Sequence, residues 1–342
     1  MKTLKILVAL SLFGLVIQPL SAQVELNKKR SKSFDDALNS TLVVNTEFAD
    51  INLVNHTKSS IDINAEIRVK GEDKASAEKL LKNYDVILEK EGNEIRIETK
   101  TKNLINKGGS IEILINVKAP ANIGLDMNAG YGDVNIAEIH GETNINVKYG
   151  SLKAAKLLHD GKDKPVKLNV QYCEPVTIGI VKNAELNLEY SKLKMTAAGV
   201  LKAHVKYAEA EFKNAVKLVV KGEYGSIQLG KISILQAEGK FSNFILNALK
   251  KRADIDMEYG GIVVSKILKS AESVDINAEY TTVSLAGLES TRLKGEARHT
   301  ELQLPGWVNI DSSSFMEKTL SGGEGNTLIN LEMKYGNLTI TE

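Results

Sequence analysis

Apolar and polar residues alternate over most of this chain, and in its middle part the same alternation returns at a regular interval. We aligned residues 200–216, 217–233 and 234–250 on Tyr207, Tyr224 and Phe241. Apolar or small residues then occupy positions −6, −4, −2, 0, +3, +5 and +8 relative to the aromatic residue. A period of two predicts a β-strand with one buried face. The step from 0 to +3 breaks this period and predicts a bend in the chain.

The aromatic residue at position 0 recurs along the chain in one context. Nine of the ten tyrosines are followed by Gly, Cys, Ser, Ala or Thr, and most of them are evenly spaced. They are Tyr131, Tyr149, Tyr172, Tyr190, Tyr207, Tyr224, Tyr259, Tyr280 and Tyr335. Phe48, Phe241 and His299 fill further copies, and Phe315 marks a degenerate one. A tight bend favours a small residue, and we expect the preceding ring to lean inwards and fill the corner.

One unit of this length is too short to bury a core alone, so the pattern favours stacked units. We predict an all-β fold, namely a single-stranded parallel β-helix (β-solenoid) with 17–18-residue repeats. Helical repeats would need about 33–47 residues. A sandwich of β-hairpins is the alternative, although Asn-Gly and Asp-Gly turns are scarce between the strands.

The residue before the aromatic residue also follows a pattern, because its charge alternates in five successive units. These residues are Glu189, Lys206, Glu223, Lys240 and Glu258, and the alternation lapses at Glu279. Strands in parallel register would place equivalent residues ~4.8 Å apart. Opposite charges at that distance attract and like charges repel. The alternation therefore favours parallel stacking, with a chance pattern as the alternative.

One segment does not follow the repeat. Residues 73–83 have the pattern of a short helix, and residues 85–89 and 94–99 alternate like strands. We expect a small strand–helix–strand insertion here. The predicted organisation is a β-rich N-terminal segment over residues 23–120, with a short helix near 73–83, and a β-solenoid of tyrosine-containing units over residues 121–342.

The stretch from Met1 to Ala22 has the pattern of a signal peptide. Lys2 and Lys5 precede an apolar run over residues 6–17, and small residues before Gln23 offer a cleavage site after Ala22. The apolar run is shorter than the ~20 residues of a membrane-spanning helix, although an uncleaved anchor is the alternative. The predicted location is therefore periplasmic, cell-surface or extracellular, with no transmembrane segment in the mature chain.

The composition narrows the choice of partners. The net charge is +1, without the clustered basic patch that nucleic-acid binding needs. Cys173 is the single cysteine, so no disulfide can form within the chain. We expect no nucleic-acid partner.

Residues capable of chemistry are few and scattered. The five histidines are His56, His140, His159, His204 and His299, and none of them pair at metal-ligand spacing. Cys173 occupies the small-residue position after Tyr172, and no base is identified for it. The stretch from Ser321 to Thr327 is glycine-rich but lacks the aspartates of repeated calcium turns. We expect no catalytic residue, no cofactor and no metal.

The chain resembles the bacterial auto-transporter adhesin, head GIN domain family, and adhesin-like proteins with β-strand repeats. The stretches that carry the resemblance are TEFADINLVN, ASAEKLLKNYDVILEKEGNEIRI, VKAPANIGLDMNAGYGDVNI and the terminal NLEMKYGNLTITE. The resemblance implies an exported β-solenoid of the cell envelope, and we expect an adhesin-like binding or structural module without catalytic activity. It supplies no catalytic residues. The partner would be an envelope protein or a polysaccharide of unknown identity. The alternative function is a polysaccharide lyase or hydrolase, which needs two carboxylates within about 5–10 Å of each other.

Overall fold

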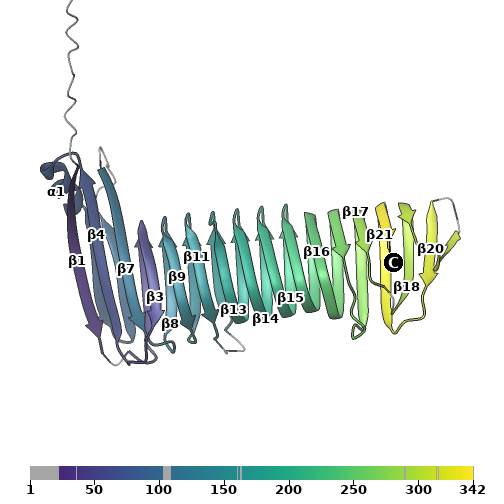
Figure 1. The fold of residues 1–342 in the computed structure, drawn as a ribbon, viewed down its shortest axis with the longest axis horizontal. Coiled ribbons are helices and arrows are strands. Elements are labelled where there is room, and N and C mark those ends of the chain that lie inside the picture. Colours follow the sequence, from purple (N-terminus) through teal and green to yellow (C-terminus); the bar gives the residue numbers. More distant parts are fainter. Residues whose placement is uncertain are drawn as a thin grey trace, which may run out of the picture.

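The computed structural model describes residues 23–35, 37–102, 109–159, 161, 164–288, 290–312, 314 and 316–341. Within these residues the chain forms 21 strands and one helix, which confirms the all-β prediction. Figure 1 shows the strands side by side in one long row, with the helix at one end. The segment with the signal-peptide pattern lies outside the described residues.

Most of the row consists of parallel strands in register. They are β8 (Gly124–Gly130), β9 (Asp133–Ile139), β10 (Thr143–Lys148), β11 (Ser151–Leu157), β12 (Val166–Gln171), β13 (Val176–Glu189), β14 (Lys192–Lys206), β15 (Glu209–Glu223), β16 (Ser226–Val264) and β17 (Ser273–Leu285). Ala203 lies beside Val220, and Val220 lies beside Ala237. These are the residues that the alignment places at position −4, so the predicted parallel register is confirmed in this part of the chain. We call the two strand segments on either side of one aromatic residue a unit.

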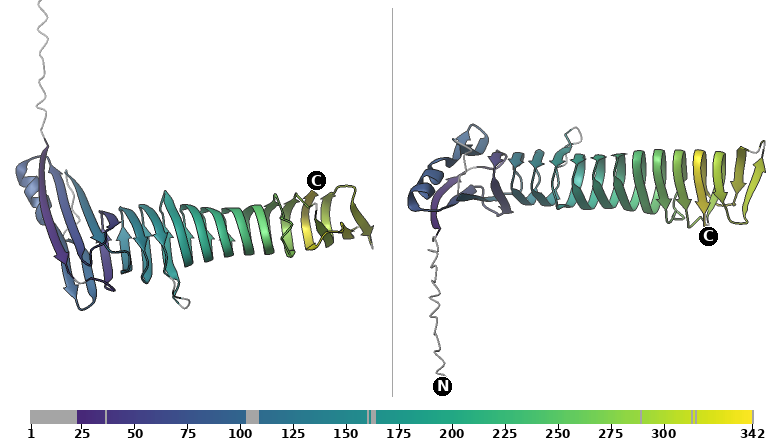
Figure 2. Two further views of the ribbon diagram at one scale, coloured as in Figure 1. Left: turned by 60° about the horizontal axis from the view of Figure 1, so that its bottom comes forward. Right: turned by 90° about the horizontal axis from the view of Figure 1, so that it is seen from above.

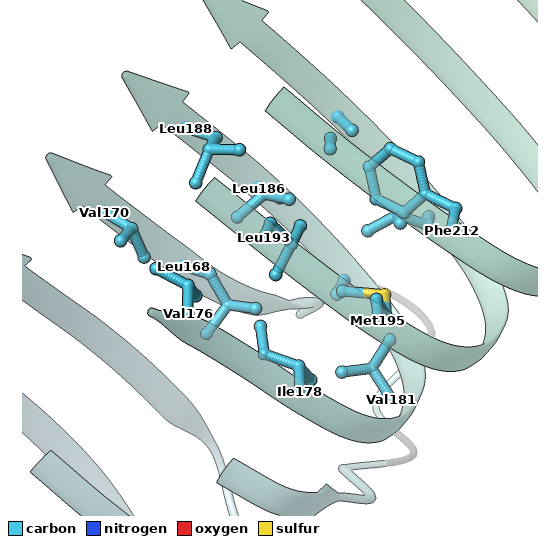
Figure 3. Packing of buried hydrophobic residues seen from close by; sticks show 14 of the residues in the cluster. Leu168, Val170, Val176, Ile178, Val181, Leu186, Leu188, Leu193, Met195 and Phe212 are labelled. Carbon is cyan, nitrogen blue, oxygen red and sulfur yellow. The ribbon is translucent and has the colours of Figure 1, made fainter. Parts of the chain in front are cut away.

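Each unit contributes two faces to one core. Figure 3 shows Leu168 and Leu186 from segments before the aromatic residue, and Ile178 and Met195 from segments after it, gathered in one cluster. The strand β13 turns back between Val181 and Leu186, so a single strand belongs to two successive units. The predicted core positions are buried, with the exception of the aromatic position itself and of Gly239, which is partly exposed.

The orientation of the aromatic residue is the main correction to the sequence-based prediction. Tyr207 does not fill the inside of its corner; it points outwards and is 42% exposed. Its backbone has φ of +49°, which turns two consecutive side chains, Lys206 and Tyr207, to the outside. The small residue Ala208 is then the one buried in the corner. The predicted bend is present, but the small residue lies on the inside of the corner and the ring lies on the outside.

The N-terminal region closes one end of the row. β1 (Val24–Phe34), β4 (Ile61–Gly71) and β7 (Gly109–Ala119) form antiparallel pairs, and β5 (Tyr84–Glu91) and β6 (Glu94–Thr101) form a hairpin. β2 (Thr41–Glu47) and β3 (Ala49–Asn55) join this region to the parallel row. β2 pairs with β6 and β8, and β3 pairs with β7 and β9. The chain therefore makes one unit around Phe48, leaves the row to build this region, and returns at β8 (Figure 2).

The predicted short helix is α1 (Lys74–Lys82). The Asp73 carboxylate accepts a hydrogen bond from the Ser76 backbone N–H at 2.7 Å, which caps the first turn. Ala77 and Leu80 are the buried residues of the helix.

The opposite end departs from chain order. The last strand, β21 (Thr327–Ile340), lies between β17 and β18 (Thr291–Gln303) and pairs in parallel with both. β20 (Glu317–Gly322) then pairs antiparallel with β18, and β19 (Val308–Ser312) pairs antiparallel with β20. The long gap before Tyr335 thus holds an antiparallel hairpin in place of a further parallel unit. The proposed degenerate copy at Phe315 lies outside the described residues.

Candidate binding surface

Twelve aromatic rings of the described residues form one continuous stacked column along the row of strands. Neighbouring ring centroids are 4.8–5.1 Å apart, and neighbouring ring planes differ by 2–17°. In spatial order the column contains Phe48, Tyr131, Tyr149, Tyr172, Tyr190, Tyr207, Tyr224, Phe241, Tyr259, Tyr280, Tyr335 and His299. His299 is last because β21 lies between β17 and β18.

Every ring of the column sits on a left-handed backbone. The φ angles of these twelve residues lie between +46° and +60°. This conformation costs about 1–2 kcal/mol for a residue other than glycine. The Tyr207 N–H donates to the Glu223 carbonyl of the next unit at 2.9 Å, and the Tyr131 N–H donates to the Lys148 carbonyl in the same way. Hydrogen bonds and ring stacking between units therefore hold a conformation that the residue alone disfavours.

The rings present their edges to solvent. Tyr131 is the most exposed of the tyrosines in the column at 51%, and Tyr259 is the least exposed at 39%. Desolvation and the neighbouring tyrosines raise the pKa of Tyr172 and Tyr280 above the usual value. These phenols therefore remain protonated near neutral pH and can both donate and accept hydrogen bonds.

The small residue after each ring fills the tight inside of the corner. A Cβ on Gly150 would collide with the Gly132 carbonyl oxygen, because the two corners approach too closely for a side chain there. Where serine occupies this position it completes the hydrogen bonding. Ser191 accepts from the Cys173 N–H at 2.9 Å and donates to the Glu189 carbonyl at 2.7 Å.

A groove runs beside the middle of the ring column. Its volume is about 770 Å³, and the rings of Tyr190, Tyr207, Tyr224 and Phe241 form one side. The other residues that line it are Glu174, Ser191, Lys192, Ala208, Glu209, Gly225, Ser226 and Asn243. Lys192 and Glu209 form an ion pair of 2.9 Å within it, and Glu209 raises the pKa of the Lys192 ammonium. The surface thus combines aromatic edges with charged and polar groups.

The alternating charges line the ring column at position −1. Lys206 lies beside Glu223, and Glu223 beside Lys240, as the sequence predicted. Lys240 and Glu258 form an ion pair of 2.9 Å. Glu223 contacts Lys221 and His204, and the hydrogen bond from Lys221 is the largest cause of its lowered pKa.

Most of the predicted candidates for chemistry lie apart from one another, although the His159 ring lies 3.3 Å from the His140 carbonyl oxygen. Cys173 is fully buried in its corner, and burial raises the pKa of its thiol. His204 lies on the outer face of β14, and His299 stacks at the end of the ring column. In the part of the chain that the structure describes, no group of three or more His, Cys, Asp or Glu residues could hold a metal ion. None of the described helices is long and apolar enough to span a membrane.

Comparison with known proteins gives three results. No family model matches the sequence, and no curated protein matches it. Among solved structures, a candidate lipid-binding protein from Parabacteroides distasonis aligns with 92% of this chain and 97% of its own, at 10% identity and a TM-score of 0.38.

Two further solved structures are named for adhesion. A candidate cell adhesion protein from Clostridium sporogenes covers 92% of this chain and 99% of its own, at 11% identity and a TM-score of 0.20. A candidate adhesin from Bacteroides fragilis covers 92% of this chain and 97% of its own, at 8% identity and a TM-score of 0.27. Identities and TM-scores at this level are too low to transfer a fold or a function to this chain.

Proposed function

We propose that this protein is an exported, adhesin-like binding module of the cell envelope, built as a β-solenoid of 17–18-residue units and acting without catalysis. The N-terminal segment, residues 23–120, would close the solenoid, and residues 121–342 would supply most of its units. The basic and apolar pattern of residues 1–22 supports export through a signal peptide. The partner would be an envelope protein or a polysaccharide.

The observation that carries this proposal is the half-exposed ring column with its groove. Contiguous exposed apolar surface bordered by polar residues is typical of an interaction site. Here the rings repeat at 4.8–5.1 Å over twelve positions, so a partner would meet the same contact many times. Many weak contacts on a rigid strip suit retention of a partner better than turnover of a substrate.

The proposal is tested by measuring retention and turnover in one experiment. The purified protein is passed over immobilised polysaccharides and envelope proteins, and the eluates are assayed for new reducing or unsaturated ends. We expect retention without product. Replacing the groove ion pair with Lys192→Ala and Glu209→Ala should weaken retention by about ten-fold, or about 1.4 kcal/mol.

The chain offers a matched control for this variant. Lys202 and Glu185 also form an ion pair between neighbouring units, at 3.6 Å, but they lie outside the groove. Alanine at both of these positions should leave retention unchanged. Sustained product formation that one point mutation abolishes would instead establish the alternative, a polysaccharide lyase or hydrolase.

A further inference from the structure

We propose that the ring column is a self-association surface, on which a second copy of this chain docks antiparallel about a two-fold axis between Tyr207 and Tyr224. This inference rests on the proposed binding role of the column and names its partner. It follows from three features of the column, namely its length, its centre and the order of the charges beside it.

The column is long and straight enough for a stable interface. Twelve rings at 4.8–5.1 Å extend over about 54 Å, and a contact about 15 Å wide along it would bury the ~800 Å² per partner of a standard interface. Neighbouring ring planes differ by no more than 17°, and the row of strands that carries the rings runs without a sharp bend (Figure 2). Two such strips can touch along their whole length.

The midpoint between Tyr207 and Tyr224 is the centre of this column, with six rings on each side. The groove is centred on the same point, because its rings are Tyr190, Tyr207, Tyr224 and Phe241. A two-fold axis at this point brings all twelve rings of one copy onto all twelve of the other. The Tyr207 hydroxyl would then meet that of Tyr224 in the other copy, and a phenol hydroxyl can both donate and accept a hydrogen bond.

The charges at position −1 match across this axis. An antiparallel copy reverses the order of the column, so Lys206 would face Glu223 and Glu189 would face Lys240 of the other copy. The remaining facing pairs are Gln171 with Glu258, Lys148 with Glu279, Gly130 with Lys334 and Glu47 with Arg298. Four of the six pairs join opposite charges, and no pair joins like charges.

Other positions of the axis lose this match. Moving the axis one unit towards the N-terminus would place Lys148 against Lys240. Moving it one unit the other way would place Glu189 against Glu279. An axis through either central ring would place Lys206 or Glu223 against its own copy. Like charges in direct contact are unfavourable, so the charge order selects the axis that also centres the rings.

The register can be tested with two charge reversals in the purified protein, followed by sedimentation velocity over a concentration series. Lys206→Glu places two glutamates against each other at two points of the dimer, and Glu223→Lys does the same with lysines. Each variant alone should show a dissociation constant raised by about ten-fold or more, most strongly at low salt. A one-to-one mixture of the two variants should restore the wild-type value, because glutamates of one copy then face lysines of the other.

Lys217→Glu is the matched control, since Lys217 is an exposed residue of β15 outside the column and the groove. It should dimerise like the wild type. Circular dichroism of every variant should confirm that the chains are folded.

The inference is overturned if the wild type remains monomeric at the highest soluble concentration, or if the mixed variants do not restore association. A monomer that is still retained by a polysaccharide through its groove would overturn the inference alone and leave the proposed function standing. If the wild type dimerises but is retained by none of the immobilised polysaccharides or envelope proteins, the proposed binding of other partners is overturned. Self-association would then be the role of the column.

Discussion

At the scale of the residue, the unusual feature is an aromatic side chain on a left-handed backbone, repeated twelve times. Glycine or asparagine would adopt this conformation at lower cost. Each inner ring instead stacks on two neighbours at about 5 Å, and each such ring pair contributes about 0.5–1.5 kcal/mol. Stacking therefore offsets the backbone strain of about 1–2 kcal/mol.

This balance predicts an order of stabilities at Tyr207. Tyr207→Ala loses both stacking contacts and keeps the strain, so it should lower the free energy of unfolding by about 1–3 kcal/mol. Tyr207→Gly loses the same contacts but relieves the strain, so it should be about 1 kcal/mol more stable than the alanine variant. Urea unfolding at low protein concentration, where any dimer is dissociated, measures both.

The buried Phe212 is the comparison for this prediction. It is 1% exposed, and Phe212→Ala should cost about 3–5 kcal/mol as a core truncation does. If Tyr207→Ala cost as much as Phe212→Ala, or if alanine at 207 were more stable than glycine, the outward and strained position of the ring would be contradicted.

At the scale of the element, β21 lies inside the row of strands, out of chain order. β21 pairs in parallel with β17 on one side and with β18 on the other. Its side chains Leu331 and Met333 belong to the core. The hairpin of β19 and β20 is therefore attached to the rest of the row through a strand that follows it in the sequence.

Removing residues 327–342 should accordingly release the C-terminal end. We expect residues 291–322 to become sensitive to limited proteolysis while residues 124–264 stay resistant. The edge of β17 would lose its partner, and an unpaired edge promotes aggregation. Removing only residues 341–342, beyond β21, should change neither property. Equal resistance of residues 291–322 with and without β21 would show that this strand does not hold the end in place.

At the scale of the whole molecule, stability should be close to a sum over units and their neighbours. Residues 200–216 form one interchangeable length of chain, because Val200 and Lys217 are register partners. Deleting these residues should leave a cooperatively folded protein with one unit fewer. The deletion would place Glu189 beside Glu223 at the new junction, where like charges repel.

The substitution Glu189→Lys should then have opposite effects in two backgrounds. In the deletion variant it faces Glu223 and should raise the free energy of unfolding by about 0.2–1 kcal/mol. In the full chain it lies beside Lys206 and should lower the free energy of unfolding by a similar amount. Both effects should shrink at high salt. Urea unfolding at two salt concentrations measures both effects. If the deletion variant no longer unfolds cooperatively, residues 200–216 are not a removable unit. If Glu189→Lys changes the free energy of unfolding in the same direction in both backgrounds, the charges at position −1 do not interact as described.

The strands, their buried faces and the bends between them could all be predicted from the amino-acid sequence. Leu201, Leu218 and Leu235 recur at one position and are all buried, because the alternation of side chains along a strand is a local property of the backbone. The short helix was equally local, since Asp73 caps it from within the same turn.

The direction of the rings, the place of β21 and the position of the groove depend instead on contacts between units that are distant in the sequence. We predicted an inward ring at Tyr207 because a large ring can fill the inside of a corner, and an aromatic residue alone disfavours the positive φ that turns the ring outwards. The contacts that reverse this preference come from the rings of the two neighbouring units, Tyr190 and Tyr224. The sequence does not predict the order of the strands either. β21 makes parallel hydrogen bonds with β17 and β18, and a strand at the end of the row would make hydrogen bonds of the same kind. The ring direction and the strand order both depend on contacts between units, and the sequence of one unit alone does not contain these contacts.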